Sequence, residues 1–282
     1  MGERIGDYQI EHEVADDGTA IVYLATHVVL PRQAHLKVPR DGSRAAAVQV
    51  LREACILEAV SQPGYPGHPG IPRVYECGVL DDRRPWSALE RIAGVSLDQL
   101  MGGGALALPE LVVVLREVAE ILRHAHDRGV VHGALDAATI IRTPRRRSGY
   151  AVGDWGHARA LDADTDVAVD PRDDVYALGA IAFRALTGVP IAPGRMAATF
   201  CPSAPGELVT VIDQMLAEPV ARPAAGEVLD RASWLSDALA APVRERPRWT
   251  PPQSMVPEGV SARDPEDETG GFAVRIGRPR TT

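Results

Sequence analysis

One side chain stands out among those that can do chemistry. Of the 30 basic residues in the 282-residue chain, Lys37 is the single Lys and all the others are Arg. The two are not interchangeable, because Lys carries a compact point charge whereas Arg presents a planar fork. An Arg-favouring composition explains the imbalance, but it does not explain where the one Lys is kept. The run 34–38 around Lys37 predicts a strand, which would position the amine.

The three cysteines indicate no further chemistry. Cys55, Cys77 and Cys201 are odd in number and lack CxxC spacing. This pattern indicates neither a disulfide framework nor a metal site. We expect buried thiols in a reducing cytoplasm.

The composition excludes several classes of protein. The net charge of −8 argues against a general nucleic-acid binder. No apolar stretch approaches the roughly 18 residues that a membrane span needs. The first residues carry charges where a signal peptide needs an apolar core. At 45% hydrophobic and 24% charged residues, the chain is expected to be globular and cytoplasmic.

Two patterns follow one another along the chain. The first hundred residues predict strands at 21–25 and 34–38, a helix at 44–60, and two strands within 71–92 joined by a turn at 81–84. Helices are then predicted at 109–128, 173–187, 206–218 and 224–240. A small β-rich lobe followed by a larger helical lobe is an α+β arrangement.

The last segment, 241–282, differs in composition. It holds seven Pro and two aromatic residues, and it combines an acidic cluster at 264–268 with an Arg-rich end. This composition predicts a disordered tail. The run 272–276 could dock as a short strand, with a solvated tail as the alternative.

Short motifs occur along the chain in the same order as in the protein kinase signature set. Because of these motifs, residues 7–240 resemble a bacterial serine/threonine protein kinase domain. The resemblance implies a bilobal kinase-like fold with an N-lobe at 7–92 and a C-lobe at 93–240, which carries a shortened activation segment. The matching positions are Lys37 in AHLKV, Glu53 in LREA, the catalytic-loop segment 126–141, Asp154-Trp155-Gly156, the segment 173–179 that includes Asp174, and Arg222.

Some site residues of the family are kept. The resemblance implies that Lys37 contacts nucleotide phosphates and is held by Glu53, while Asp154 holds magnesium. The alternative is a salt network between the lobes, in which these three residues serve the fold alone. The resemblance also assigns the purine-site lining to Val22, Leu89 and Ile141, with Leu89 as gatekeeper.

The catalytic loop 132–139 departs from the family pattern H-R-D-L-K-P-x-N. Ala134 occupies the position of the catalytic base, and its methyl group cannot take a proton. Loss of a general base lowers the reaction rate by about 10²–10⁴-fold. Gly133 replaces the Arg that grips a phosphorylated activation loop. Asp136 inverts a charge near the transferred phosphate, and Thr139 replaces the Asn that holds the second magnesium. We expect no catalytic residue in this loop.

The segments expected to bind nucleotide and substrate also depart from the family pattern. Ala15, Asp17 and Ala20 replace the three signature glycines, which normally let backbone N–H groups approach phosphate. His35 replaces a small Ala that packs on the adenine, unless the strand turns it outward. No A-P-E motif follows Asp154. In the family the Glu of that motif pairs with the Arg at the position of Arg222, so we expect Arg222 to pair with Asp170 or Asp173 instead.

These losses predict a pseudokinase that acts by binding another protein, such as an active kinase or a signalling complex. It would require no cofactor, although ATP and magnesium remain candidate ligands. One alternative is a weak or atypical ATP-dependent kinase or nucleotidyl transferase that uses Lys37, Glu53 and Asp154. The other is a regulatory platform for the tail 241–282.

Overall fold

The structure is a computed structural model that describes residues 3–240 except 17, 62–66, 145, 162–168 and 193. The described residues fall within one compact unit, Met1–Ala241. The predicted tail 241–282 and its run 272–276 lie outside the described residues, as does Asp17. No helix in the described part of the chain is both long enough and apolar enough to cross a membrane.

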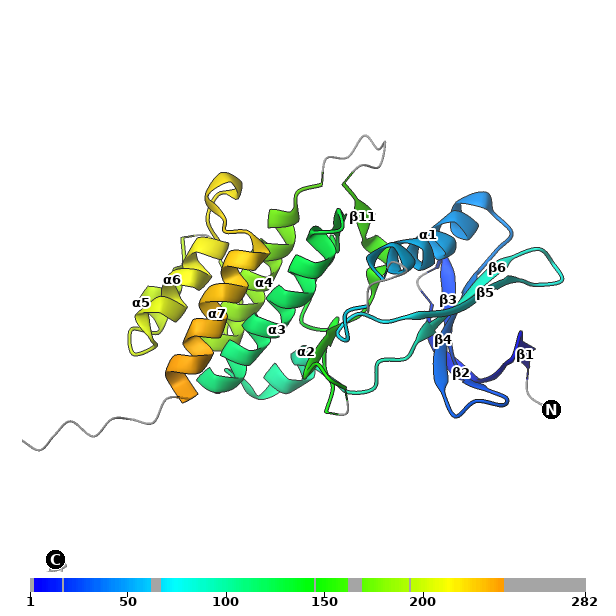
Figure 1. Ribbon diagram of the computed structural model, residues 1–282, viewed down its shortest axis with the longest axis horizontal. Helices are drawn as coiled ribbons and strands as arrows, with labels where there is room; N and C mark the ends of the chain where they lie inside the picture. Colours follow the sequence, from blue (N-terminus) through cyan, green and yellow to red (C-terminus); the bar gives the residue numbers. More distant parts are fainter. Residues whose placement is uncertain are drawn as a thin grey trace, which may run out of the picture. The chain divides into compact units, whose positions relative to one another are not determined.

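The first lobe is a six-stranded antiparallel sheet packed against one helix (Figure 1). The order of its strands is β1-β2-β3-β4-β6-β5. The helix α1 spans Arg44–Val60, as predicted. The strands are β1 (Arg4–Ile5), β2 (Tyr8–Asp16), β3 (Ala20–His27), β4 (Gln33–Pro39), β5 (Val74–Val79) and β6 (Pro85–Glu90).

Alternation along β4 explains how the sheet directs its side chains. Ala34, Leu36 and Val38 are buried in a small core on one face of the sheet. His35 and Lys37 therefore point to the opposite face, because successive side chains of a strand alternate. The helix α1 begins at the cap residue Ser43, whose Oγ accepts from the Ala46 N–H at 3.2 Å.

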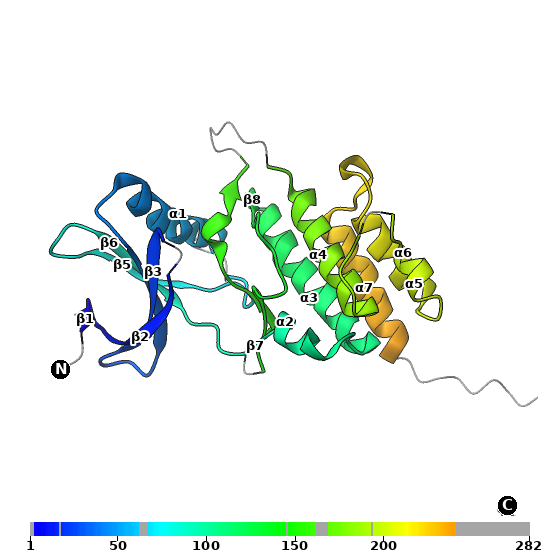
Figure 2. The same cartoon turned by 180° about the vertical axis from the view of Figure 1, so that it is seen from behind.

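The second lobe is mainly helical, and the four predicted long helices are confirmed within a few residues (Figure 2). The two helices of four residues were not predicted, because one turn is too short to show a periodic pattern. The helices are α2 (Leu97–Leu100), α3 (Leu108–His126), α4 (Pro171–Thr187), α5 (Ala197–Phe200), α6 (Gly206–Met215) and α7 (Ala225–Ala240).

Two small sheets carry the loops that matter for the site. In one, β7 (Val95–Ser96), β9 (Ile140–Arg142) and β10 (Tyr150–Val152) pair in the order β10-β9-β7. In the other, β8 (Val130–Val131) pairs with β11 (Arg159–Ala160). The catalytic loop 132–139 lies between β8 and β9, and Asp154 follows β10. The expected α+β arrangement is confirmed.

None of the three cysteines is buried as predicted. Cys55 and Cys77 are exposed and Cys201 is half-buried. Cys55 lies two residues after Glu53 on α1, which rotates it to the solvent side of the helix. Cys77 lies on β5, the last strand of the sheet, and no other described strand pairs with its outer edge.

Candidate functional site

The centre of the site is an ion pair between β4 and α1. The Lys37 ammonium contacts the Glu53 carboxylate, and these side chains are 18% and 5% exposed. Lys37 Nζ also lies 3.9 Å from Asp154 Oδ1, and the Asp154 side chain is 58% exposed. The fold therefore brings together the three residues that the sequence singled out. Glu53 is enclosed, whereas the Asp154 carboxylate faces solvent and is accessible to a further cation besides Lys37.

The backbone around Asp154 is fixed from both lobes. Asp154 adopts a left-handed conformation with φ of +56°. The next residue, Trp155, is fully buried, and its indole N–H donates to the Val152 carbonyl at 2.9 Å. Arg52 on α1 donates to the Gly156 carbonyl at 2.9 Å. These contacts hold the carboxylate of Asp154 in its place beside Lys37.

A buried stack joins the two lobes behind this centre. Leu57 and Trp155 belong to one core cluster and are fully buried. The ring of His132 meets that of Trp155 edge-on, with centroids 4.8 Å apart. His132 Nε2 lies 3.0 Å from the Gly153 carbonyl, and burial lowers the pKa of His132. These three residues therefore contribute to the packing between the lobes.

Asp174 organises the start of the catalytic loop from the first turn of α4. Its carboxylate, 1% exposed, accepts from the backbone N–H groups of His132 and Gly133, each at 2.8 Å. His126 Nε2 lies 2.9 Å from the same carboxylate. Gly133 has a φ of +75°, a conformation that Gly adopts at little cost. The loop backbone is thus held although its side chains have changed.

The rest of the catalytic loop closes on itself. Asp136 Oδ1 accepts from the Ala138 N–H at 2.9 Å, a local turn. The Thr139 hydroxyl donates to the Asp136 carbonyl at 2.9 Å and accepts from the Asp136 N–H at 3.2 Å. Ala134 is exposed and presents only its methyl group. The one carboxylate and the one hydroxyl of segment 132–139 are both engaged in holding the loop.

The strand register places four side chains on the face of the sheet that bears Lys37. Val22 pairs with Lys37 and His35 pairs with Leu89. Directly paired residues share a face, so His35 is not turned to the outer face, and burial lowers its pKa. Ile141, the third predicted purine-lining residue, is half-buried on β9.

The tip of the β2–β3 hairpin is tied to the end of β4. Asp16 accepts from the Gly18 N–H at 2.9 Å and forms an ion pair with Arg40. Arg40 in turn donates its backbone N–H to the Thr19 carbonyl at 2.8 Å. The hydrogen bond from Arg40 holds the pKa of Asp16 below its usual value. A carboxylate, already paired, therefore stands where a glycine-rich loop would receive phosphate.

Comparison with known proteins gives this geometry a family. No family model matches the chain. The serine/threonine-protein kinase PknJ of Mycobacterium tuberculosis is 30% identical over 226 residues, which cover 70% of this chain and 37% of PknJ. PrkC of Bacillus subtilis, another serine/threonine-protein kinase, is 26% identical over 213 residues, 67% of this chain and 32% of PrkC.

The chain is a homologue of bacterial serine/threonine protein kinases. A solved structure, the kinase domain of Mycobacterium tuberculosis PknI, matches with a TM-score of 0.61 and 25% identity, covering 84% of this chain and 97% of that domain. The bilobal kinase fold is thereby confirmed. The chain spans about a third of the length of the curated relatives described above.

Arg222 confirms one expectation about the kinase C-lobe. Its Nη1 donates to Asp173 Oδ1 at 3.0 Å, and its Nε donates to the Ala217 carbonyl at 2.8 Å. Its guanidinium also lies over the Tyr176 ring, 4.6 Å from the centroid. The other candidate, Asp170, instead caps α4 by accepting from the Arg172 N–H at 2.9 Å. The predicted replacement partner of Arg222 is therefore Asp173.

Sequence reasoning missed a clamp on the segment that joins the lobes. Arg146, in the β9–β10 loop, donates to both carboxylate oxygens of Glu90, at 2.6 and 3.4 Å. It also donates to the Pro69 carbonyl at 2.9 Å. The two charged side chains are 17% and 18% exposed. Arg146 lies in a run of three arginines, and nothing in that run distinguishes the one that makes the clamp.

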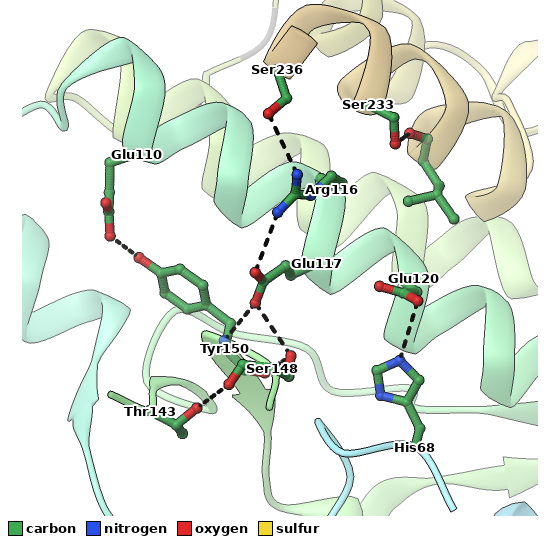
Figure 3. A network of polar contacts seen from close by, with 11 residues as sticks. His68, Glu110, Arg116, Glu117, Glu120, Thr143, Ser148, Tyr150, Ser233 and Ser236 are labelled. Carbon is green, nitrogen blue, oxygen red and sulfur yellow. Dashed lines mark hydrogen bonds and ion pairs between the residues drawn. The ribbon is translucent and has the colours of Figure 1, made fainter. Parts of the chain in front are cut away.

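A second network holds β10, the strand that leads to Asp154, against α3 (Figure 3). Glu117 on α3 accepts from the Tyr150 N–H at 2.7 Å and from the Ser148 hydroxyl at 3.2 Å. Glu110, also on α3, accepts from the Tyr150 hydroxyl, and burial raises the pKa of that hydroxyl. The position of Asp154 thus depends on α3 as well as on α1.

Proposed function

We propose that this chain is a pseudokinase: a protein of the kinase fold that transfers no phosphate and acts by binding another protein. The catalytic loop carries the proposal. Ala134 offers a methyl group at the base position, and the Asp136 carboxylate is turned onto the Ala138 N–H. At the base position a substrate hydroxyl would find no proton acceptor, and the one carboxylate of segment 132–139 has its Oδ1 engaged with the Ala138 N–H. Loss of a general base alone removes about 10²–10⁴-fold of rate.

The metal ligands support the same proposal. Asp154 is one exposed carboxylate beside Lys37, which suits contact with a single magnesium. The Thr139 hydroxyl, at the position of the second ligand, is already engaged with the Asp136 backbone. Among the described residues no cluster of three or more His, Cys, Asp or Glu side chains could hold a metal. The donor set does not fit two magnesium ions.

The phosphate and purine sides add two obstacles to nucleotide. At the hairpin tip the Asp16 carboxylate, in an ion pair with Arg40, already accepts from the Gly18 N–H, a backbone donor of the kind that phosphate oxygens would need. His35 brings an imidazole to the face that Val22 and Leu89 share. Together these features favour a domain whose nucleotide site is vestigial. Val22, Leu89 and Ile141 then serve as lobe packing.

A phosphotransfer assay tests the proposal. The full chain is incubated with labelled ATP, magnesium or manganese, and a general protein substrate, beside the variant Asp154→Ala. We expect no incorporation above background in either protein. Turnover that Asp154→Ala abolishes would overturn the proposal, because a contaminating kinase would not respond to that substitution.

A second function is favoured by one observation, the intact contact of Lys37 with Glu53 and Asp154. This arrangement is what an ATP-dependent kinase or nucleotidyl transferase needs to hold phosphates, so a weak or atypical enzyme is the alternative. Calorimetry with ATP and magnesium on wild type and Lys37→Ala tests the alternative: absence of binding rules out an ATP-dependent enzyme, whereas binding is compatible with both functions. Arg184→Ala, on the exposed side of α4, is the matched control. Absence of binding in all three proteins would remove the enzyme.

The remaining assignments are part of the same proposal. We place the N-lobe at 7–92 and the C-lobe at 93–240, with the joining segment at Glu90 and the residues after it. A cytoplasmic location suits a signalling role beside an active kinase. The relatives are named as serine/threonine-protein kinases. We propose a binding role for this chain because its catalytic loop departs from the family pattern.

A further inference from the structure

The outer face of α7 carries an exposed tryptophan. Trp234 is 60% exposed, whereas Trp86 and Trp155 are 4% and 0% exposed. A large aromatic side chain left in water costs free energy that burial against a partner would recover. Among the tryptophans of the described residues, Trp234 is therefore the one that is not buried in the core.

Carboxylates surround this tryptophan at helical spacing. Glu227, Asp230 and Asp237 lie seven and four residues before and three residues after Trp234, so all four share one face of α7. All four are exposed. We call this set the Trp234 face. Across the described part of the chain, neither Asp230 nor Asp237 forms an ion pair.

A hollow lies beside the Trp234 face. It has a volume of about 350 Å³ and is lined by Glu207, Asp230, Arg231 and Trp234. The one cation in this lining is already engaged, because Arg231 Nε lies 2.6 Å from Glu207 Oε1 and its Nη1 donates to the Gln214 side chain. The hollow therefore presents an indole and an unpaired carboxylate.

We propose that the Trp234 face docks an arginine-containing segment of another protein. A guanidinium seated over an indole gains a cation–π contact, and the nearby carboxylates complement its charge. Trp and Arg are also the residues that most often dominate interface energy. Docking here does not depend on whether the chain binds nucleotide.

The charge on this face disfavours two other occupants. A second copy of the chain in a two-fold contact would set the same carboxylates against each other. A membrane surface rich in anionic lipids would be repelled for the same reason. A basic segment is the occupant that the charges and the indole both fit.

Fluorescence anisotropy with a labelled arginine-rich peptide tests the docking. The matched control peptide carries citrulline at each arginine position, which keeps the shape and removes the charge. The full-length protein is compared with Trp234→Ala, Asp230→Asn/Asp237→Asn and the control Val220→Ala, an exposed apolar residue (86%) outside the Trp234 face. Thermal unfolding of each variant verifies that it is folded.

We expect Trp234→Ala to weaken binding about tenfold or more, as loss of an aromatic anchor does. The double Asn variant should weaken binding about fivefold and reduce its salt dependence. Val220→Ala should bind as wild type does, and the citrulline peptide should not bind. Equal affinity of Trp234→Ala and wild type, or equal binding of the two peptides, would overturn the proposal.

Discussion

Replacing Lys37 with Met removes the cation that faces the enclosed Glu53 carboxylate between β4 and α1. Glu53 is 5% exposed, so water cannot take the place of the lost partner. Breaking such a buried pair costs about 3–5 kcal/mol. For a domain of this size, that corresponds to a fall in Tm of roughly 6–20 °C. Thermal and urea unfolding without nucleotide measure this directly, so the result reports on the fold and not on a ligand.

A double-mutant cycle makes the test specific to the pair. Lys37→Met combined with Glu53→Leu removes both charges, and we expect it to be less destabilising than the sum of the two single changes by at least about 2 kcal/mol. The matched control is Arg184→Met, in an ion pair with Asp98 whose side chains are 39% and 48% exposed. It should cost about 1 kcal/mol or less. If Lys37→Met costs no more than Arg184→Met, or if the cycle is additive, the pair does not support the fold.

Three further perturbations follow from the contacts in the C-lobe and near α1. Asp174→Ala leaves two backbone N–H groups without an acceptor, so urea unfolding should show a loss of about 3–5 kcal/mol; a loss below about 1 kcal/mol would contradict that role. Arg222→Ala should cost about 1–3 kcal/mol, but Asp173→Ala, at a 65% exposed position, should cost less than about 1 kcal/mol; the reverse order would be inconsistent with the geometry. Burial and the nearby His124 lower the pKa of His68 to about 4, so the folded protein binds fewer protons than the unfolded chain between about pH 4 and 6.5. Stability should therefore fall as the pH is lowered through that range, and His68→Gln should flatten the profile; parallel profiles would show that His68 does not contribute.

Local patterns in the sequence determined most of the elements and the family. The helix 44–60 could be predicted because its apolar residues recur at helical spacing. Lys37 and Asp154 could be placed because each lies in a short motif whose order along the chain is characteristic. Even the need of Arg222 for a new acid could be anticipated, since a missing partner leaves a buried cation to be satisfied.

Tertiary structure alone decided how the altered catalytic loop uses its remaining polar groups. Thr139 and Asp136 could each have faced a ligand, but both hydrogen bond within the loop. Arg146 meets Glu90 across 56 residues, and an Arg-rich chain offers no local signal for that pairing. Short-range periodicity determines elements, whereas a contact between distant side chains depends on how those elements pack. The sequence by itself therefore identified a kinase ancestry and its losses, and only the packed fold showed which of the surviving charges are already satisfied.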